Sequence, residues 1–156
     1  MRRKIRVKRD LRPDDKFGSE KVAKFVNYMM LDGKKEVALA VFYDTIDRIK
    51  ELEKTETPLE IFDIALKNVE PTMEVRSRRV GGANYQVPVE VRPKRREEYS
   101  MKWIIQIARA KKGRPMHEKL ADEIIAASKN EGDAITKREN VHKMAESNKA
   151  FAHFAW

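Results

Sequence analysis

Three arginines within four residues could bind the phosphate groups of a nucleic acid. Arg76, Arg78 and Arg79 come directly before a glycine-rich stretch at residues 81–84. A planar guanidinium group can donate two parallel hydrogen bonds to one phosphate, so arginine suits this task. The alternative is a solvated strand that carries charge without a partner. Contact with nucleic acid is favoured, because an isolated two-stranded ribbon is marginal in water and is hard to explain as a packing element.

Further basic residues gather in separate parts of the chain. An N-terminal arm contains Arg2, Arg3, Lys4, Arg6, Lys8 and Arg9. A second group, which follows the ribbon, contains Arg92, Lys94, Arg95 and Arg96, and a third contains Arg109, Lys111, Lys112 and Arg114. We predict that all of them contact nucleic acid, although for the arm composition alone leaves a solvated terminus equally open. For the third group, local stabilisation of a helix C-terminus by its dipole is an alternative.

The charge of the chain is distributed in blocks of one sign. The 156 residues include 34 Lys and Arg against 25 Asp and Glu, a net charge of +9. Residues 1–16 carry a net charge of +5, residues 76–96 carry +6 and residues 109–119 carry +4, whereas residues 36–70 carry −5. A basic surface attracts polyanions, either nucleic acid or an acidic membrane face.

Residue types that carry out catalysis or bind metals are scarce or isolated. There is no cysteine, which excludes thiolate nucleophiles, disulfides and cysteine-ligated zinc. His117, His142 and His153 are accompanied by no HExxH or Gly-x-Ser-x-Gly motif, so we interpret them as surface or helix-end residues. The segment 32–35 contains Gly-Lys but lacks the spacing of a phosphate-binding loop. We therefore expect no catalytic site, no metal, no cofactor and no enzymatic activity.

No segment suits a membrane. The longest apolar run, residues 37–43, has seven residues, whereas a membrane-spanning helix needs about 20. The basic N-terminus is followed by no apolar stretch of the kind found in a secretory signal. We expect a soluble, cytosolic protein.

Hydrophobic periodicity predicts a mainly α fold: a six-helix single domain with one protruding two-stranded β-hairpin and a basic N-terminal arm. The arm, residues 1–16, lacks hydrophobic periodicity and is expected to be flexible, and residues 17–156 are expected to form one helical domain. The hairpin is expected at about residues 73–91, with strands 73–80 and 85–91 and a turn at 81–84. We expect its tip to be mobile, because the hairpin has no wide apolar face.

Capping signals place the ends of several helices. Ser19 is a candidate N-cap for the first helix, and Gly33 is expected to end it. Thr57-Pro58-Leu59-Glu60 and Thr136-Lys137-Arg138-Glu139 have the pattern of capping boxes, which would open the third and sixth helices. The second helix is expected at residues 34–54, the fourth between Pro93 and Gly113, and the fifth at 115–130.

A helical body with a basic ribbon and a basic arm is typical of architectural nucleic-acid binders, and by itself it leaves RNA and DNA open. Proteins that bend DNA also pair helices with β-ribbons, but they insert an apolar wedge at the ribbon tip. The tip here is Gly-Gly-Ala-Asn, which argues against that class. An enzyme acting on RNA would need a base or metal site that the sequence lacks.

The hairpin segment, Met73–Pro93, closely resembles the signature of the bacterial ribosomal protein seven family of the small subunit. Its sequence is MEVRSRRVGGANYQVPVEVRP. The resemblance continues at residues 24–27 (KFVN), 32–35 (DGKK) and 137–154, and covers the chain from about residue 10 to its end.

This resemblance implies a ribosome-bound, cytoplasmic protein of six helices and one protruding hairpin. It implies early binding to the 3′ major domain of small-subunit rRNA, which nucleates assembly of the head, beside neighbouring small-subunit proteins and with no DNA partner. It also implies proximity to the exit-site tRNA and to the mRNA exit path. The rRNA-facing residues would be the arm, Lys34, Lys35, Arg76, Arg78, Arg79, Arg92, Lys94, Arg95 and Arg96. The tRNA-facing residues would be Gly81, Gly82, Ala83 and Asn84, with Lys143.

Overall fold

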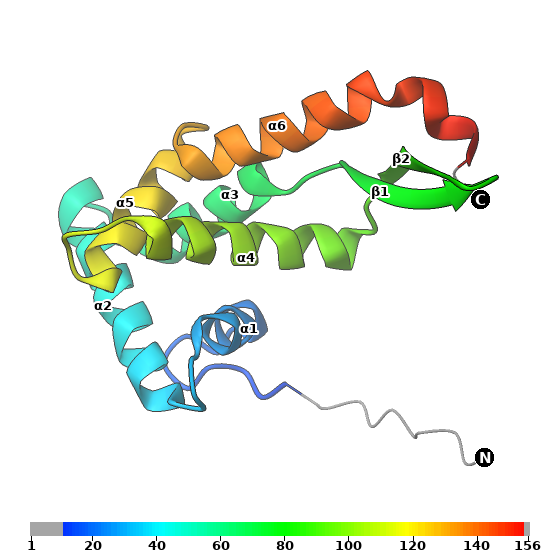
Figure 1. Cartoon of the computed structure of the whole chain (residues 1–156). Coiled ribbons are helices and arrows are strands. Elements are labelled where there is room, and N and C mark those ends of the chain that lie inside the picture. Colours follow the sequence, from blue (N-terminus) through cyan, green and yellow to red (C-terminus); the bar gives the residue numbers. More distant parts are fainter. Residues whose placement is uncertain (1–10, 155–156) are drawn as a thin grey trace, which may run out of the picture. The chain divides into compact units, whose positions relative to one another are not determined.

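The computed structural model describes residues 11–154, and this part of the chain is mainly helical (Figure 1). In chain order its elements are α1 (Glu20–Met29), α2 (Lys35–Glu53), α3 (Pro58–Val69), β1 (Met73–Val80), β2 (Ala83–Glu90), α4 (Pro93–Ala110), α5 (Met116–Ser128), α6 (Asp133–Ser147) and the 3₁₀ helix η1 (Lys149–Phe154). Six α-helices and one hairpin in the described residues confirm the predicted fold class. The chain divides within α2 into two compact units, with the boundary between Ala40 and Val41. A single domain over residues 17–156 stays a prediction.

The first unit already has local order before residue 17, where the arm was expected to continue. The carboxylate of Asp14 accepts hydrogen bonds from the backbone N–H groups of Lys16 and Phe17, at 3.2 and 3.1 Å. Ser19 is confirmed as the N-cap of α1, since its hydroxyl oxygen accepts a hydrogen bond from the N–H of Val22. The expected end at Gly33 is wrong: α1 ends at Met29, because the residues at 31–33 are exposed and a further turn would bury nothing.

The core of the second unit lies where α3, α4 and α5 pack together. Phe42 and Phe62 meet edge to face, with ring centroids 5.5 Å apart, and both are buried. The predicted stripes of α4 and α5 are confirmed as core, because the following side chains are all buried: Met101, Ile104, Ile105, Ala108, Leu120, Ile124 and Ala127. This packed body supports the hairpin and the basic ends of α4.

Both predicted capping boxes are wrong in their contacts. The Thr57 hydroxyl donates to the carboxylate of Glu60 at 3.1 Å, and the Thr57 side chain does not cap the α3 backbone. The sixth helix begins at Asp133, three residues before Thr136. Its N-terminus is capped from another helix, because the buried carboxylate of Glu123 on α5 accepts a hydrogen bond from the N–H of Ala134 at 2.9 Å. That long-range partner replaces the local cap.

The hairpin turn is tighter than expected. Strands β1 and β2 pair antiparallel from Met73 opposite Glu90 to Val80 opposite Ala83. The turn therefore consists of Gly81 and Gly82 alone, with φ of +57° and +89°. Two consecutive residues at positive φ suit a two-residue hairpin turn, which glycine adopts without a steric penalty. Ala83 and Asn84, expected in the turn, belong to β2.

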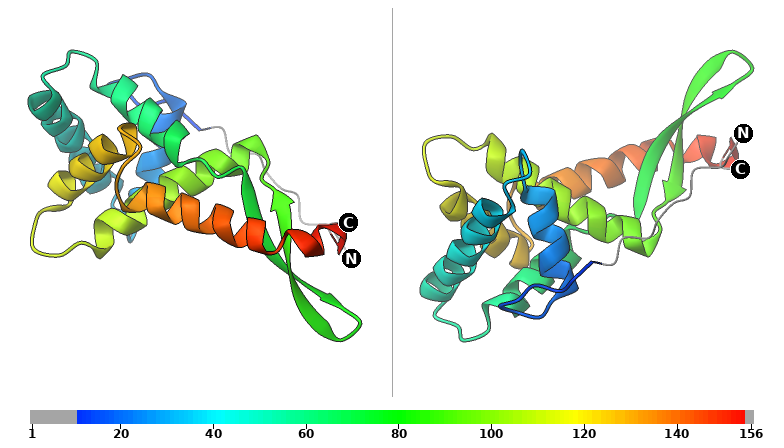
Figure 2. Two further views of the ribbon diagram at one scale, coloured as in Figure 1. Left: turned by 90° about the horizontal axis from the view of Figure 1, so that it is seen from above. Right: turned by 90° about the horizontal axis from the view of Figure 1, so that it is seen from below.

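The hairpin packs against η1 and α6, although the sequence predicts a ribbon without a packing partner. The ring of Tyr85 lies 5.3 Å from the ring of Phe151 and 5.0 Å from that of Phe154, both in η1. Helix α6 also contacts both strands. Beyond this support the strands extend past the helices of the second unit (Figure 2). The ribbon has no wide apolar face of its own, and the aromatic residues of η1 provide the apolar side chains that pack against it.

His142 joins α6 to the segment before β1. Its Nε2 atom accepts a hydrogen bond from the backbone N–H of Thr72 at 3.0 Å, which requires the neutral imidazole. Burial, together with the charge of Arg138, lowers the pKa of His142 below its ordinary value. The unfolded chain thus takes up a proton at this residue before the folded chain does.

We expect this histidine to contribute stability that is lost in acid. Above a pH of about 6.5, where the imidazole is neutral in both states, its contribution is complete. As the pH falls towards the lowered pKa, the unfolded state gains the proton first and is favoured. The difference in urea midpoint between the parent and His142→Ala should therefore narrow between pH 7.5 and pH 5.5. A constant or widening difference would contradict this assignment, and His153→Ala, which removes an exposed imidazole, serves as the control.

Candidate nucleic-acid interface

Strand β1 presents its three arginines in different surroundings. Side chains alternate along a strand, so Arg76 and Arg78 lie on one face with Glu74, and Arg79 lies on the other. Arg79 is exposed and has no ion pair or hydrogen bond to a described residue. Arg78 is half-buried. Arg79 is therefore the arginine of β1 whose charge is least committed within the fold.

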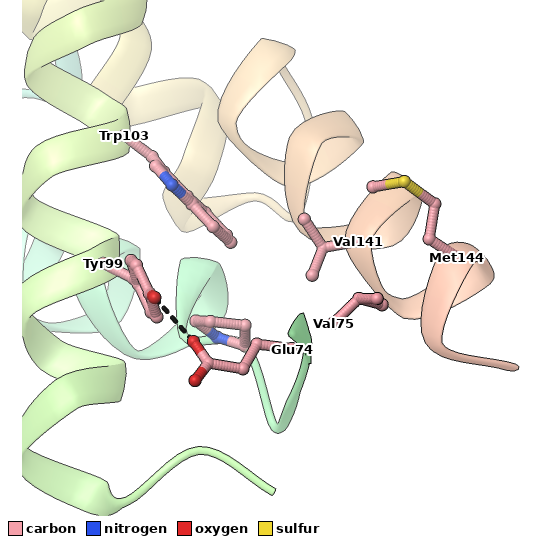
Figure 3. A pocket seen from close by; sticks show the side chains of 7 residues that line it. Glu74, Val75, Tyr99, Trp103, Val141 and Met144 are labelled. Atoms are coloured by element: carbon pink, nitrogen blue, oxygen red, sulfur yellow. Dashed lines mark hydrogen bonds between the residues drawn. The ribbon is translucent and has the colours of Figure 1, made fainter. Parts of the chain in front are cut away.

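Glu74 brings Arg76 of β1 together with Arg95 of α4. The Nε atom of Arg76 lies 2.5 Å from one carboxylate oxygen, and that of Arg95 lies 3.3 Å from the other. The hydroxyl of Tyr99 donates to the same carboxylate at 2.5 Å (Figure 3). Glu74 is buried, whereas both arginines are partly exposed. Two predicted RNA-binding residues from separate elements thus share one carboxylate.

The start of α4 places the other three predicted residues beside the base of the hairpin. Arg96 donates to the backbone carbonyl of Val91 at 2.7 Å and pairs with Glu90 at 2.9 Å. Arg92 and Lys94 are exposed and form no ion pair with residues 11–154. We use the name hairpin-base surface for these residues and the arginines of β1 together: Arg76, Arg78, Arg79, Arg92, Lys94, Arg95 and Arg96. Of these, Arg78 and Arg79 lie nearer the turn than the base of the hairpin.

The predicted residues at the far end of α4 lie apart from this surface. Helix α4 has 18 residues, which corresponds to a length of about 27 Å, and Figure 1 shows it leading away from the hairpin. Lys111 pairs with the buried Glu123 and lies 3.5 Å from Asp133, and Arg114 pairs with Asp122 at 2.7 Å. Lys111 and Arg114 are therefore paired within the protein, by carboxylates of α5 and α6.

The environment of Lys111 favours its charged form. Burial opposes the charge, but the hydrogen bond that Lys111 donates to Glu123 and the charges of Glu123 and Asp133 outweigh it, so the pKa of Lys111 is raised. Lys111 thereby holds the carboxylate that caps α6. Its neighbour Lys112 is exposed, and no described residue pairs with it.

The remaining predicted residues are dispersed. Lys34 and Lys35 are exposed in the first unit. Gly81, Gly82, Ala83 and Asn84 are exposed at the hairpin tip, and Lys143 is exposed on α6. The arm residues Arg2, Arg3, Lys4, Arg6, Lys8 and Arg9 lie outside the described residues.

Neither a metal site nor a membrane span is found in the described part of the chain. Between residues 11 and 154, no group of three His, Asp or Glu side chains is arranged to hold a metal ion. Over the same residues, every helix is too short or too polar to cross a membrane.

Comparison with known proteins places the chain in a family. A family model described as ribosomal protein S7p/S5e matches residues 1–149. The chain belongs to the ribosomal protein S7p/S5e family. The predicted resemblance to the bacterial ribosomal protein seven family is thereby confirmed.

Curated relatives of this S7p/S5e chain share its full length. Small ribosomal subunit protein uS7 of Thermotoga maritima is 54% identical over 156 residues, which cover both chains completely. The protein of the same name from Chromohalobacter salexigens is 52% identical over 153 residues, covering 98% of this chain and 97% of the relative. That of Francisella philomiragia is 54% identical over 155 residues, covering 99% of each.

Two residues of this S7p/S5e chain that organise the hairpin-base surface were missed at the sequence level. Glu74 and Tyr99 also line an apolar pocket of about 190 Å³, whose other walls include Val75, Trp103, Val141 and Met144 (Figure 3). Tyr99 stacks on Trp103, with ring centroids 5.4 Å apart. The available signal was an acidic residue two positions before Arg76, which places both side chains on one face of the strand.

Proposed function

We propose that this chain is a structural constituent of the small ribosomal subunit that binds its rRNA and catalyses no reaction. The observation that carries the proposal is the hairpin-base surface, whose basic side chains come from β1 and the start of α4. Among them, Arg79, Arg92 and Lys94 pair with no residue between 11 and 154. Membership of the S7p/S5e family supports it. A ribosome-bound, cytoplasmic location follows from this function.

Binding would work through phosphate neutralisation by residues of a rigid body. Arg79, Arg92 and Lys94 would release counterions from the RNA backbone when they contact it, which favours association. Recognition would depend on the shape of a junction between RNA helices and on 2′-hydroxyl contacts, since the deep groove of A-form RNA is closed to side chains. The packed helices of the second unit keep the basic residues at fixed positions for such a junction.

The wider contacts of the chain belong to the same proposal. The junction would lie in the 3′ major domain, where binding would nucleate assembly of the head beside neighbouring small-subunit proteins. The arm residues Arg2 to Arg9, together with Lys34 and Lys35, would add phosphate contacts. The exposed tip at 81–84 and Lys143 would face the exit-site tRNA, near the path by which mRNA leaves.

We expect rRNA binding to weaken steeply with salt. If about six to eight basic residues contact phosphates, log K plotted against log salt concentration should have a slope of roughly −4 to −7, at 0.7 to 0.9 per contact. The slope can be measured by titrating a fluorescent fragment of small-subunit rRNA between 50 and about 300 mM KCl. A slope shallower than about −2 would mean that the basic groups remain solvated, which would overturn the proposal.

A further inference from the structure

A buried carboxylate is an unexpected group within a surface proposed to bind phosphates. Glu74 has only 8% of its side chain exposed. Its two oxygens accept hydrogen bonds from Arg76 and Tyr99 and form an ion pair with Arg95. Its negative charge would repel a nearby phosphate. Such a carboxylate is compatible with RNA binding if it orients neighbouring arginine donors and this gain in affinity exceeds the loss caused by its repulsion of the phosphate.

The contacts of Glu74 fix two guanidinium groups and leave part of each available. Arg76 uses its Nε and Nη2 atoms for one oxygen of Glu74. Arg95 uses Nε for the other oxygen, and its Nε and Nη2 atoms also donate to the Tyr99 hydroxyl. The Nη1 group of each arginine has no partner among the described residues. Since 44% and 49% of the two side chains are exposed, these donors can reach an external anion.

The charge of the cluster remains positive. Burial opposes ionisation of Glu74, but hydrogen bonds from Tyr99 and Arg76 and the charges of Arg95 and Arg76 outweigh it, so the pKa of Glu74 is lowered. Burial and the hydrogen bond to Glu74 raise the pKa of Tyr99, which stays a neutral donor. Two guanidinium groups thus share one carboxylate, and one positive charge remains for a second anion.

We propose that Glu74 is a positioning residue that holds Arg76 and Arg95 ready to bind one backbone phosphate of RNA. The proposal rests on the rRNA-binding function proposed above and names the ligand of this part of the surface. Free arginine side chains lose rotamer freedom when they bind, and a side chain already held in place loses less. Arg95 is further restrained by Tyr99, because its guanidinium carbon lies 5.2 Å from the centre of that ring.

The direction in which one substitution changes the affinity for rRNA distinguishes a positioning role from a purely electrostatic one. Glu74→Gln in the full chain removes one negative charge, so electrostatics alone would tighten binding to the rRNA fragment. If Glu74 positions the arginines, binding should instead weaken by about tenfold or more, the effect expected when charge-assisted hydrogen bonds to phosphate are lost. Glu90→Gln is the matched control. It also removes one carboxylate charge from the hairpin, but Arg96 keeps its bond to the carbonyl of Val91, so binding should be unchanged or tighter.

A second variant keeps the test independent of folding. Tyr99→Phe removes the hydroxyl that bonds Glu74 and Arg95 without changing the charge of the protein. It should weaken rRNA binding several-fold, whereas a purely electrostatic effect would leave the affinity unchanged. Nitrogen-15 NMR of the arginine Nε–H groups in the free chain should show slow exchange at Arg76 and Arg95 in the parent and faster exchange in Glu74→Gln.

The outcomes distinguish this inference from the proposed function. If the parent binds rRNA with the steep salt dependence above and both variants bind at least as tightly as the parent, the positioning role is overturned and the rRNA-binding function stands. If the parent itself binds rRNA without that salt dependence, the proposed function fails and the positioning role fails with it. Weaker binding by Glu74→Gln or, where that variant does not fold, by Tyr99→Phe, with Glu90→Gln unaffected, supports the positioning role.

Discussion

Replacing Arg79 and Arg92 together with alanine should weaken binding to small-subunit rRNA at least about 100-fold. Each arginine would lose charge-assisted hydrogen bonds to phosphate, worth about 1.5–3 kcal/mol. Both side chains are exposed and form no hydrogen bond or ion pair with residues 11–154, so the fold loses no such interaction. The melting temperature should stay within a few degrees of the parent. Fluorescence titration and thermal unfolding would measure the two effects.

A variant with the same loss of charge serves as the control. Lys50 on α2 and Lys67 on α3 are exposed, have no ion pair with a described residue, and lie in the acidic segment 36–70. Lys50→Ala/Lys67→Ala also lowers the net charge by two, and its affinity should fall only slightly. Equal weakening by both double variants would mean that RNA responds to overall charge, and the assignment of the hairpin-base surface would be wrong.

Truncating Phe62 should lower the stability of the fold and leave the affinity for rRNA unchanged, the opposite of the arginine variant. This side chain is 1% exposed and packs against Phe42 in the core of the second unit. Phe62→Ala should lower the free energy of unfolding by about 3–5 kcal/mol, because it removes buried apolar surface and leaves a cavity. Urea unfolding measures this loss. The affinity for rRNA per folded molecule should barely change.

The same helix provides the comparison for Phe62. Ile64 on α3 is 49% exposed, so Ile64→Ala should cost far less stability than Phe62→Ala. Similar losses for the two variants would show that Phe62 contributes no more than a surface residue. A fall in rRNA affinity beyond the unfolded fraction would place Phe62 in the binding site.

The fold class and core were predictable because they depend on periodic patterns within each element. The apolar stripe Met101, Ile104, Ile105 and Ala108 identified the buried face of α4 without any knowledge of its neighbours. The cap of α6 was not predictable in this way. The acceptor that caps α6, Glu123, lies on another helix. The local pattern at Thr136 could not indicate that the helix would begin three residues earlier, at Asp133. Packing of Tyr85 against Phe151 is likewise a contact between segments far apart in sequence.

The basic residues of the site were predictable as a set, but their partners were not. Charge blocks identified Arg76 and Arg95 as candidates, and their contact through Glu74 depends on how α4 packs beside β1. Conversely, Lys111 and Arg114 were grouped with the other basic residues by composition, although their carboxylate partners come from α5 and the start of α6. The spacing of residues along the sequence predicts contacts within one helix or strand, but it does not predict contacts between separate elements.

One titration tests the central claim most directly. The full chain is titrated at the same salt concentration with a junction fragment of small-subunit rRNA and with a duplex DNA of equal charge. If the chain is an rRNA-binding constituent of the small subunit, it should bind the junction at least about tenfold more tightly, because A-form shape and 2′-hydroxyl groups contribute beyond charge. Equal or tighter binding to the DNA would contradict the proposed function and favour an architectural DNA-binding protein.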